Sequence, residues 1–110
     1  MRPKISESDW KIFRQVRAGA LERFCERVLS EVSRLAAEPG RSGHQRYLAV
    51  FELLQKQDKQ LADTFDNPRR STAFLQLLRM RYEDLLTEEE LARFSPETRA
   101  RVQGVLDPDD

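Results

Sequence analysis

The acidic run over residues 83–90 is the part of this sequence whose residue types and spacing come nearest to a catalytic site. Carboxylates grouped in this way could hold Mg²⁺, as a metal-dependent hydrolase built of helices would require. Such a site needs a second acidic pair on a neighbouring helix, and the preceding segments lack one. Thr87 followed three residues later by Glu90 matches a capping box, so we interpret the run as a helix start and expect neither a metal nor a cofactor.

Cys25 and His44 are the only cysteine and the only histidine in the chain. Cys25 falls beside Phe24 and Val28 on an apolar helix stripe, which predicts a small buried side chain rather than a nucleophile. His44 follows Gly43 at an expected helix start and has no acidic or cysteine neighbour at the spacing of a metal site. The sequence also contains no phosphate-binding glycine loop, serine nucleophile motif or zinc-binding helix motif. It therefore favours a non-catalytic protein over an enzyme.

Arg69, Arg70 and Arg81 are candidates for binding an anion. The first two follow a proline at an expected helix N-terminus, where free backbone N–H groups favour negative charge. Arg70 and Arg81 would share one face of a helix over residues 70–86. These residues could contact the phosphate of a small anion or a nucleic acid; the alternative is a solvated face with internal ion pairs. The formal net charge of zero, from 19 basic and 19 acidic residues, gives nucleic acids and membranes no general attraction.

Asp58 interrupts an apolar helix face and is the most unusual polar residue in the sequence. The residues expected to face inward on that helix are Tyr47, Val50, Phe51, Leu54, Leu61, Ala62 and Phe65. Arg14 and Arg17 are similarly out of place, because a continuous first helix would put them inside an apolar stripe. A buried carboxylate is costly unless it is paired, so an ion pair between Asp58 and one of these arginines would explain both anomalies. The alternative is a polar pocket between helices that binds a small anion or a partner's side chain.

The elements that would position these residues are all helices. Hydrophobic residues make up 39% of the chain and charged residues 35%, and good helix formers dominate. The apolar spacing and the Pro and Gly stops predict an all-α bundle of five to six helices in one domain over residues 1–110. Three main helices are expected at about 20–37, 44–65 and 70–86, with short helices near both ends and frayed tails at 1–5 and 107–110.

Two short C-terminal helices are predicted by their caps, at Thr87 and at Ser95 followed by Pro96. The helix before them, over residues 70–86, is expected to bury Phe74, Leu75, Leu78, Tyr82, Leu85 and Leu86. The last helix, over residues 97–106, is expected to bury Val102, Val105 and Leu106.

Residues 8–38 contain no proline and could form one helix of about 45 Å, longer than a compact chain of this size can cover from end to end. Such a length suggests either a break or a partner. The apolar residues before and after Gly19 lie on different faces of a continuous helix. Since glycine costs roughly 1 kcal/mol in a helix interior, we favour a break there, with a short helix over 7–17 before the long one. The rival interpretation is an unbroken helix whose two ends pack against different neighbours.

The apolar stripe over residues 20–37 is broader than one or two neighbouring helices normally cover. We therefore expect a protein that acts through protein–protein contacts, forming a homodimer through this helix face or binding another protein there. The N-terminal sequence has no apolar leader, and no apolar run reaches the ~18 residues of a membrane span. We accordingly expect a cytoplasmic protein whose partner is neither a membrane nor a nucleic acid.

Overall fold

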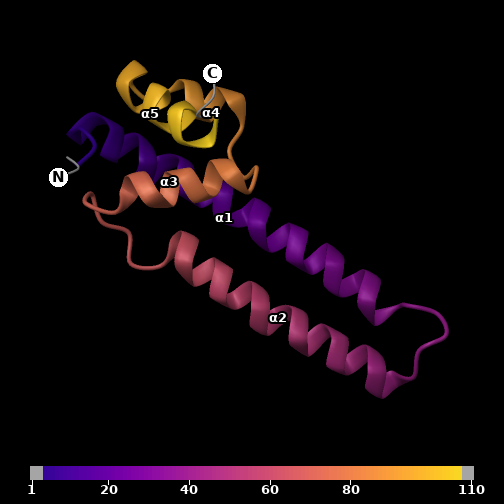
Figure 1. The fold of residues 1–110 in the computed structure, drawn as a ribbon. Coiled ribbons are helices and arrows are strands. Elements are labelled where there is room, and N and C mark those ends of the chain that lie inside the picture. The colour runs from indigo at the N-terminus through magenta and orange to yellow at the C-terminus, as the bar shows by residue number, and fades with distance from the viewer. Residues whose placement is uncertain (1–3, 108–110) are drawn as a thin grey trace.

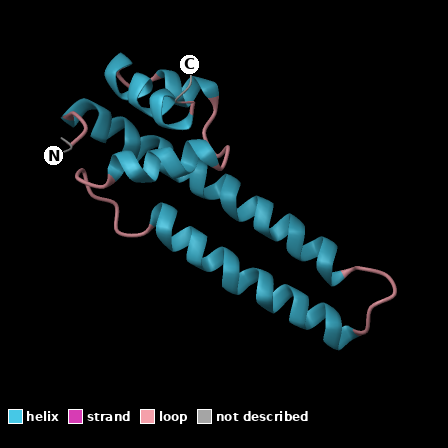
Figure 2. Cartoon of the chain, viewed as in Figure 1, coloured by secondary structure: helices cyan, strands magenta, loops and turns pink. Residues whose placement is uncertain are grey.

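All regular structure between residues 4 and 107, the part of the chain that the computed structural model describes, is helical. The helices are α1 (Glu7–Ala36), α2 (Gly43–Phe65), α3 (Ala73–Tyr82), α4 (Glu88–Ala92) and α5 (Pro96–Leu106). The predicted all-α fold with three longer helices packed together is confirmed (Figures 1 and 2). The outer parts of the two expected tails, residues 1–3 and 108–110, lie outside the described residues.

The helices form an elongated molecule with one thin end. Its principal extents are 52 × 30 × 26 Å and its radius of gyration is 16.9 Å, against about 13 Å for a compact domain of this length. Figure 1 shows the reason: α1 and α2 run side by side as a long hairpin, while α3, α4 and α5 gather around the first half of α1. Within the described chain, no third helix lies beside the second half of the hairpin.

The first helix, α1, is continuous over 30 residues, so the favoured break near Gly19 is wrong. Ser6 caps its start by accepting a hydrogen bond from the backbone N–H of Asp9 (3.1 Å). A Cβ at Gly19 would lie 3.3 Å from Oε2 of Glu90 and 3.4 Å from Nη2 of Arg23, so the glycine makes room for these side chains. The rival interpretation was right, because the first half of α1 packs into the core with α3 and the second half packs against α2.

The buried core lies at the base of the hairpin, where the first half of α1, the end of α2 and the later helices meet. Its members are Ile5, Phe13, Val16, Ala20, Phe24, Phe65, Ala73, Phe74, Leu77, Met80, Leu85, Leu86, Phe94 and Val102. The rings of Phe24 and Phe65 meet edge to face with centroids 6.0 Å apart, which joins α1 to the end of α2. The core therefore holds one end of the hairpin and leaves the other end outside it.

The third helix ends at Tyr82, earlier than expected, because Asp84 takes a left-handed conformation with φ of 59°. The backbone N–H of Leu85 donates to the carbonyl of Met80 (2.8 Å), and the N–H of Asp84 donates to the carbonyl of Arg81 (3.0 Å). These two bonds close the helix in a Schellman motif. Leu85 is buried as expected, but in the turn that follows the helix.

The buried face of α3 is rotated from the expected one. Leu75 and Tyr82 are 60% and 77% exposed, so their predicted burial is wrong. The residues that α3 buries are Ala73, Phe74, Gln76, Leu77 and Met80. Leu85 and Leu86 reach the core from the turn after the helix, so they do not lie on the face that α3 buries.

The predicted starts of α4 and α5 are confirmed. Thr87 and Glu90 form the reciprocal capping box, with the backbone N–H of each residue donating to the side chain of the other at 3.0 Å. Ser95 caps α5. The expected burial of Val105 and Leu106 is wrong, because the last turn of α5 runs past the core and leaves them 54% and 38% exposed.

Asp9 joins the start of α5 to the start of α1. Its carboxylate accepts hydrogen bonds from the backbone N–H of Ser95 (2.9 Å), from Oγ of Ser95 (2.7 Å) and from Oγ1 of Thr98 (2.7 Å), and the residue is only 1% exposed. Burial raises the pKa of Asp9, but the hydrogen bonds from Thr98 and Ser95 outweigh it and leave the pKa below its usual value. The buried carboxylate of this fold is therefore Asp9, whereas the sequence pointed to Asp58.

Candidate functional site

The second half of the hairpin contains no buried residue, since every residue from 25 to 63 is at least partly exposed. Its tip is closed by Arg46, which donates from Nη1 to the carbonyl of Ala36 (2.6 Å). Two helices that touch along one line bury only part of their apolar surface, and helices normally gain most of their stability from packing a broad apolar face. The hairpin therefore presents apolar side chains to water over much of its length.

Five large apolar side chains on this part of the hairpin are exposed, and one of them, Leu48 on α2 (41% exposed), lies apart from the other four beside Gly40 and Arg41. Leu29 on α1 is 57% exposed, and Tyr47, Phe51 and Leu54 on α2 are 65%, 48% and 44% exposed. The rings of Tyr47 and Phe51 stack with centroids 6.4 Å apart. We call these four residues the hairpin face.

A groove of about 270 Å³ between α1 and α2 adjoins the hairpin face. It is lined by Phe24, Cys25, Val28, Leu29, Leu54, Gln57, Asp58 and Leu61. Most of these side chains are apolar, so the groove continues the hairpin face towards the core. Cys25, which was expected to be buried, is only half-buried here.

The exposure of Tyr47, Phe51 and Leu54 contradicts the expectation that they point into a core. The side of α2 towards α1 is mixed, since Leu53, Gln57 and Gln60 line a second groove with residues of α1. Because the described chain places no further helix on the other side, the apolar side chains there are left without cover.

Asp58 is exposed at the edge of the groove and forms no ion pair with Arg14 or Arg17, so the predicted internal bridge is wrong. Arg17 instead donates from Nη2 to the carbonyl of Phe65 (2.5 Å), at the C-terminus of α2. Asp58 lies seven residues earlier on that helix, a separation of about 10 Å. Arg14 is exposed and lies over the ring of Trp10, with its guanidinium 5.4 Å from the ring centroid.

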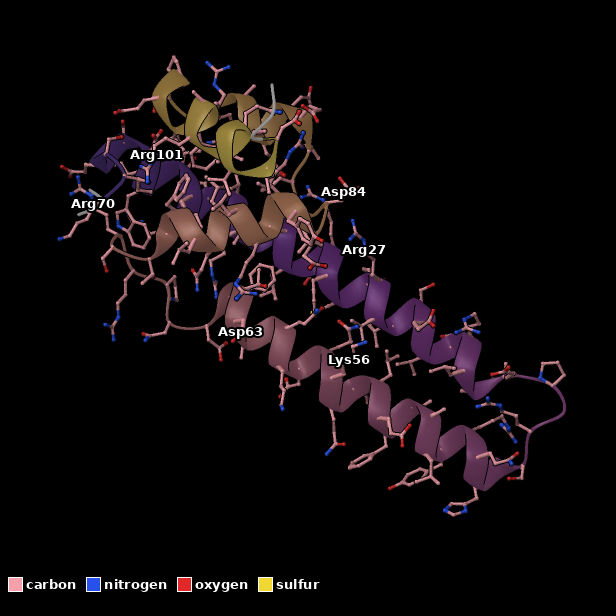
Figure 3. The ribbon with its side chains drawn as sticks, viewed as in Figure 1. Arg27, Lys56, Asp63, Arg70, Asp84 and Arg101 are labelled. Carbon is pink, nitrogen blue, oxygen red and sulfur yellow. The ribbon has the colours of Figure 1, made fainter. Side chains whose placement is uncertain are left out.

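Arg69, Arg70 and Arg81 do not meet at a common site. The helix α3 begins later than expected, so Arg69 and Arg70 lie in the turn before it. Arg70 donates from Nε to the carbonyl of Ile5 (2.8 Å), which helps to bury a residue that was expected in a frayed tail. Figure 3 shows Arg70 beside the N-terminal end of α1. Arg81 lies at the opposite end of α3 and pairs with Glu88 (2.9 Å).

Arg23 and Arg27 fasten the end of α3 to the middle of α1. Arg23 donates to the carbonyl of Leu85 (2.6 Å) and pairs with both carboxylate oxygens of Glu90 (2.8 and 3.0 Å), which holds the pKa of Glu90 below its usual value. Arg27 donates to the carbonyl of Asp84, and both residues are labelled in Figure 3. The sequence gives no signal for these contacts, because the acceptors are backbone carbonyls 62 and 57 residues along the chain and, for Arg23, also the carboxylate of Glu90, 67 residues along.

Within residues 4–107, no group of three or more His, Cys, Asp or Glu side chains is placed to hold a metal ion. The acidic run over 83–90 is divided between the turn after α3 and the first turn of α4. None of the helices in the described range combines the length and the apolar character needed to cross a membrane.

Comparisons of the chain with protein-family models, with curated proteins and with solved structures gave no match.

Proposed function

We propose that this chain is a non-catalytic cytoplasmic protein that acts through protein–protein contacts, and that the hairpin face joins two copies in a homodimer. The observation that supports the proposal best is the exposure of four large apolar side chains on a hairpin that has no buried residue from 25 to 63. Exposed apolar patches of this kind mark interaction surfaces on proteins that fold in water.

The size of the hairpin face suits a dimer of ordinary dimensions. Its four side chains are each about half exposed, which gives roughly 400 Å² of apolar surface, because large side chains carry about 150–250 Å² each. A standard interface buries about 800 Å² on each partner, of which roughly 60% is apolar. The hairpin face with its adjoining groove therefore offers about the apolar area that one copy needs.

The length of α1 supports the same proposal. A helix of 30 residues spans about 45 Å, and the two explanations for such a helix in a small chain were a break or a partner. The helix is unbroken, and its second half is covered only by α2 within the described chain. A second copy would supply the cover that the length requires.

Sedimentation equilibrium at micromolar concentration tests the proposal. We expect a species of twice the chain mass of 12.9 kDa. Leu54→Glu should convert it to a monomer with unchanged far-ultraviolet circular dichroism, because a charge in the hairpin face would have to be buried on association. The matched control is Tyr82→Glu, a change at a 77% exposed position on α3, which should leave the dimer intact.

A wild-type chain that sediments as a monomer at these concentrations would rule out the homodimer. A dimer that survives Leu54→Glu would show that a different surface joins the copies.

A further inference from the structure

Five exposed side chains of α2, followed by Leu61, which packs partly against the core, recur at the spacing of a coiled-coil seam. Alternating intervals of three and four residues connect His44, Tyr47, Phe51, Leu54, Asp58 and Leu61. The first five are exposed and Leu61 is partly exposed. This spacing keeps the six residues, which we call the α2 seam, on one face of the helix, where they can pack against a partner helix.

We infer that two copies pair antiparallel along the α2 seam, with the two-fold axis of the dimer between Phe51 and Leu54. The inference specifies the contact in the proposed homodimer and depends on that proposal. In a two-fold dimer, if residue i of one copy contacts residue j of the second copy, then residue j of the first copy also contacts residue i of the second. An axis at this point sets Phe51 against Leu54 of the second copy, and Asp58 against Tyr47 of the second copy.

Asp58 gives the reason for the antiparallel direction. Opposite Tyr47 of the second copy, its carboxylate accepts a hydrogen bond from the phenol, and His44 of that copy lies one turn further on. The two-fold axis repeats this polar contact at both ends of the seam, so that Phe51 and Leu54 form a dry centre between them.

A parallel pairing in register would place each Asp58 against Asp58 of the second copy, inside an apolar seam. Like carboxylates at that distance in a desolvated interface oppose association. A single polar residue in an otherwise apolar seam fixes the register of paired helices in this way, at some cost in stability. The residue that was out of place in the monomer thus acquires a role in the dimer.

Cysteine cross-linking of the full chain tests the direction and the register. The parent is Cys25→Ser, which removes the single native cysteine. One sample mixes Tyr47→Cys chains with Asp58→Cys chains, refolded together, and another contains Asp58→Cys alone; both are treated with a short bis-maleimide. In the antiparallel dimer the Tyr47→Cys and Asp58→Cys positions are adjacent, whereas the two Asp58→Cys positions are about 16 Å apart along the seam.

We expect the mixed sample to give at least about five-fold more cross-linked dimer than Asp58→Cys alone, since only the mixed pair lies within reach. A second mixed pair, His44→Cys with Leu61→Cys, keeps Tyr47 and Asp58 in place and should also cross-link, more slowly because position 61 is partly buried against the core. Stronger cross-linking of His44→Cys alone than of this second pair, in chains that all keep Asp58, would establish the parallel arrangement. A dimer by sedimentation that cross-links in none of these samples would overturn the α2 seam alone, whereas a monomeric wild-type chain would overturn the proposed homodimer as well.

Discussion

Replacing Asp9 with alanine tests whether one buried carboxylate holds the start of α5 against α1. The substitution removes the acceptor of three hydrogen bonds, of 2.9, 2.7 and 2.7 Å, and leaves the backbone N–H of Ser95 and the hydroxyl of Thr98 without that acceptor. A hydrogen bond to a charged group contributes about 1.5–3 kcal/mol, and a buried donor left unpaired costs about 1–3 kcal/mol. Allowing for partial relaxation, we expect Asp9→Ala to lower the free energy of unfolding by about 3–5 kcal/mol.

The expected loss is a large part of the free energy of unfolding of a domain of this size, which is typically about 5–15 kcal/mol. It corresponds to a urea midpoint lower by roughly 2 M, given a denaturant dependence of about 1–3 kcal/mol per M. Asp9→Asn should cost about 1–2 kcal/mol, because the amide oxygen still accepts one hydrogen bond but the charge is lost.

Urea unfolding followed by circular dichroism measures these differences, at one fixed protein concentration so that any dimer contributes equally. The matched control is Glu7→Ala, which removes an exposed acid from the same first turn of α1 and should cost about 0.5 kcal/mol or less. An Asp9→Ala chain that unfolds at the wild-type midpoint would refute the assignment of Asp9 as the anchor of α5.

Two further predictions concern the base of the molecule. The pKa values of Asp9 and Glu90 are lower in the folded chain than in the unfolded one. The stability that these two carboxylates contribute is therefore complete above their unfolded pKa values and is lost as the pH falls through their folded pKa values. The urea midpoint should decrease when the pH is lowered below about 4, and it should decrease less steeply in Asp9→Asn. Gly19→Ala should change the free energy of unfolding by less than about 0.5 kcal/mol, because the helix gain of about 1 kcal/mol opposes a Cβ contact of 3.3 Å with Glu90. In a Glu90→Ala chain the same substitution should stabilise by more, up to about 1 kcal/mol, because only the flexible Arg23 side chain then lies near the new Cβ; equal effects in both chains would contradict a constraint by Glu90.

The helix starts could be predicted from the sequence because their signals are local. Ser6, Thr87 and Ser95 each accept a hydrogen bond from a backbone N–H three residues later, and this geometry depends only on neighbouring residues. The end of α3 depends instead on the left-handed conformation of Asp84. An aspartate in the sequence does not by itself predict that conformation. The sequence therefore predicted this helix in the correct part of the chain, but the predicted range of 70–86 is longer than the observed Ala73–Tyr82.

The partner of a buried charge could not be predicted, because it is set by tertiary packing. Asp58 stands among apolar residues and is exposed, whereas Asp9 stands in a polar first turn and is 1% exposed. The residues that satisfy Asp9 lie 86 and 89 positions away, at the start of α5. Arg17, which was expected to pair with a carboxylate, donates to a backbone carbonyl 48 positions away, and every residue type offers that acceptor.

The rotation of α2 about its own axis connects the fold to the proposed dimer. The sequence placed the dimer contact on the stripe over residues 20–37, but α2 covers part of that stripe, and four of the five large apolar side chains exposed on the hairpin lie on α2 itself. A turn of α2 by about 100° would bury Phe51 and Leu54 against α1, but it would also expose Leu53 and turn Asp58 inwards. The observed orientation places Leu53 beside Gln57 and Gln60 in the groove with α1 and leaves Asp58 exposed in the α2 seam. In the proposed homodimer this orientation suits both sides of the helix, because Leu53 packs towards α1 while the α2 seam packs against its copy.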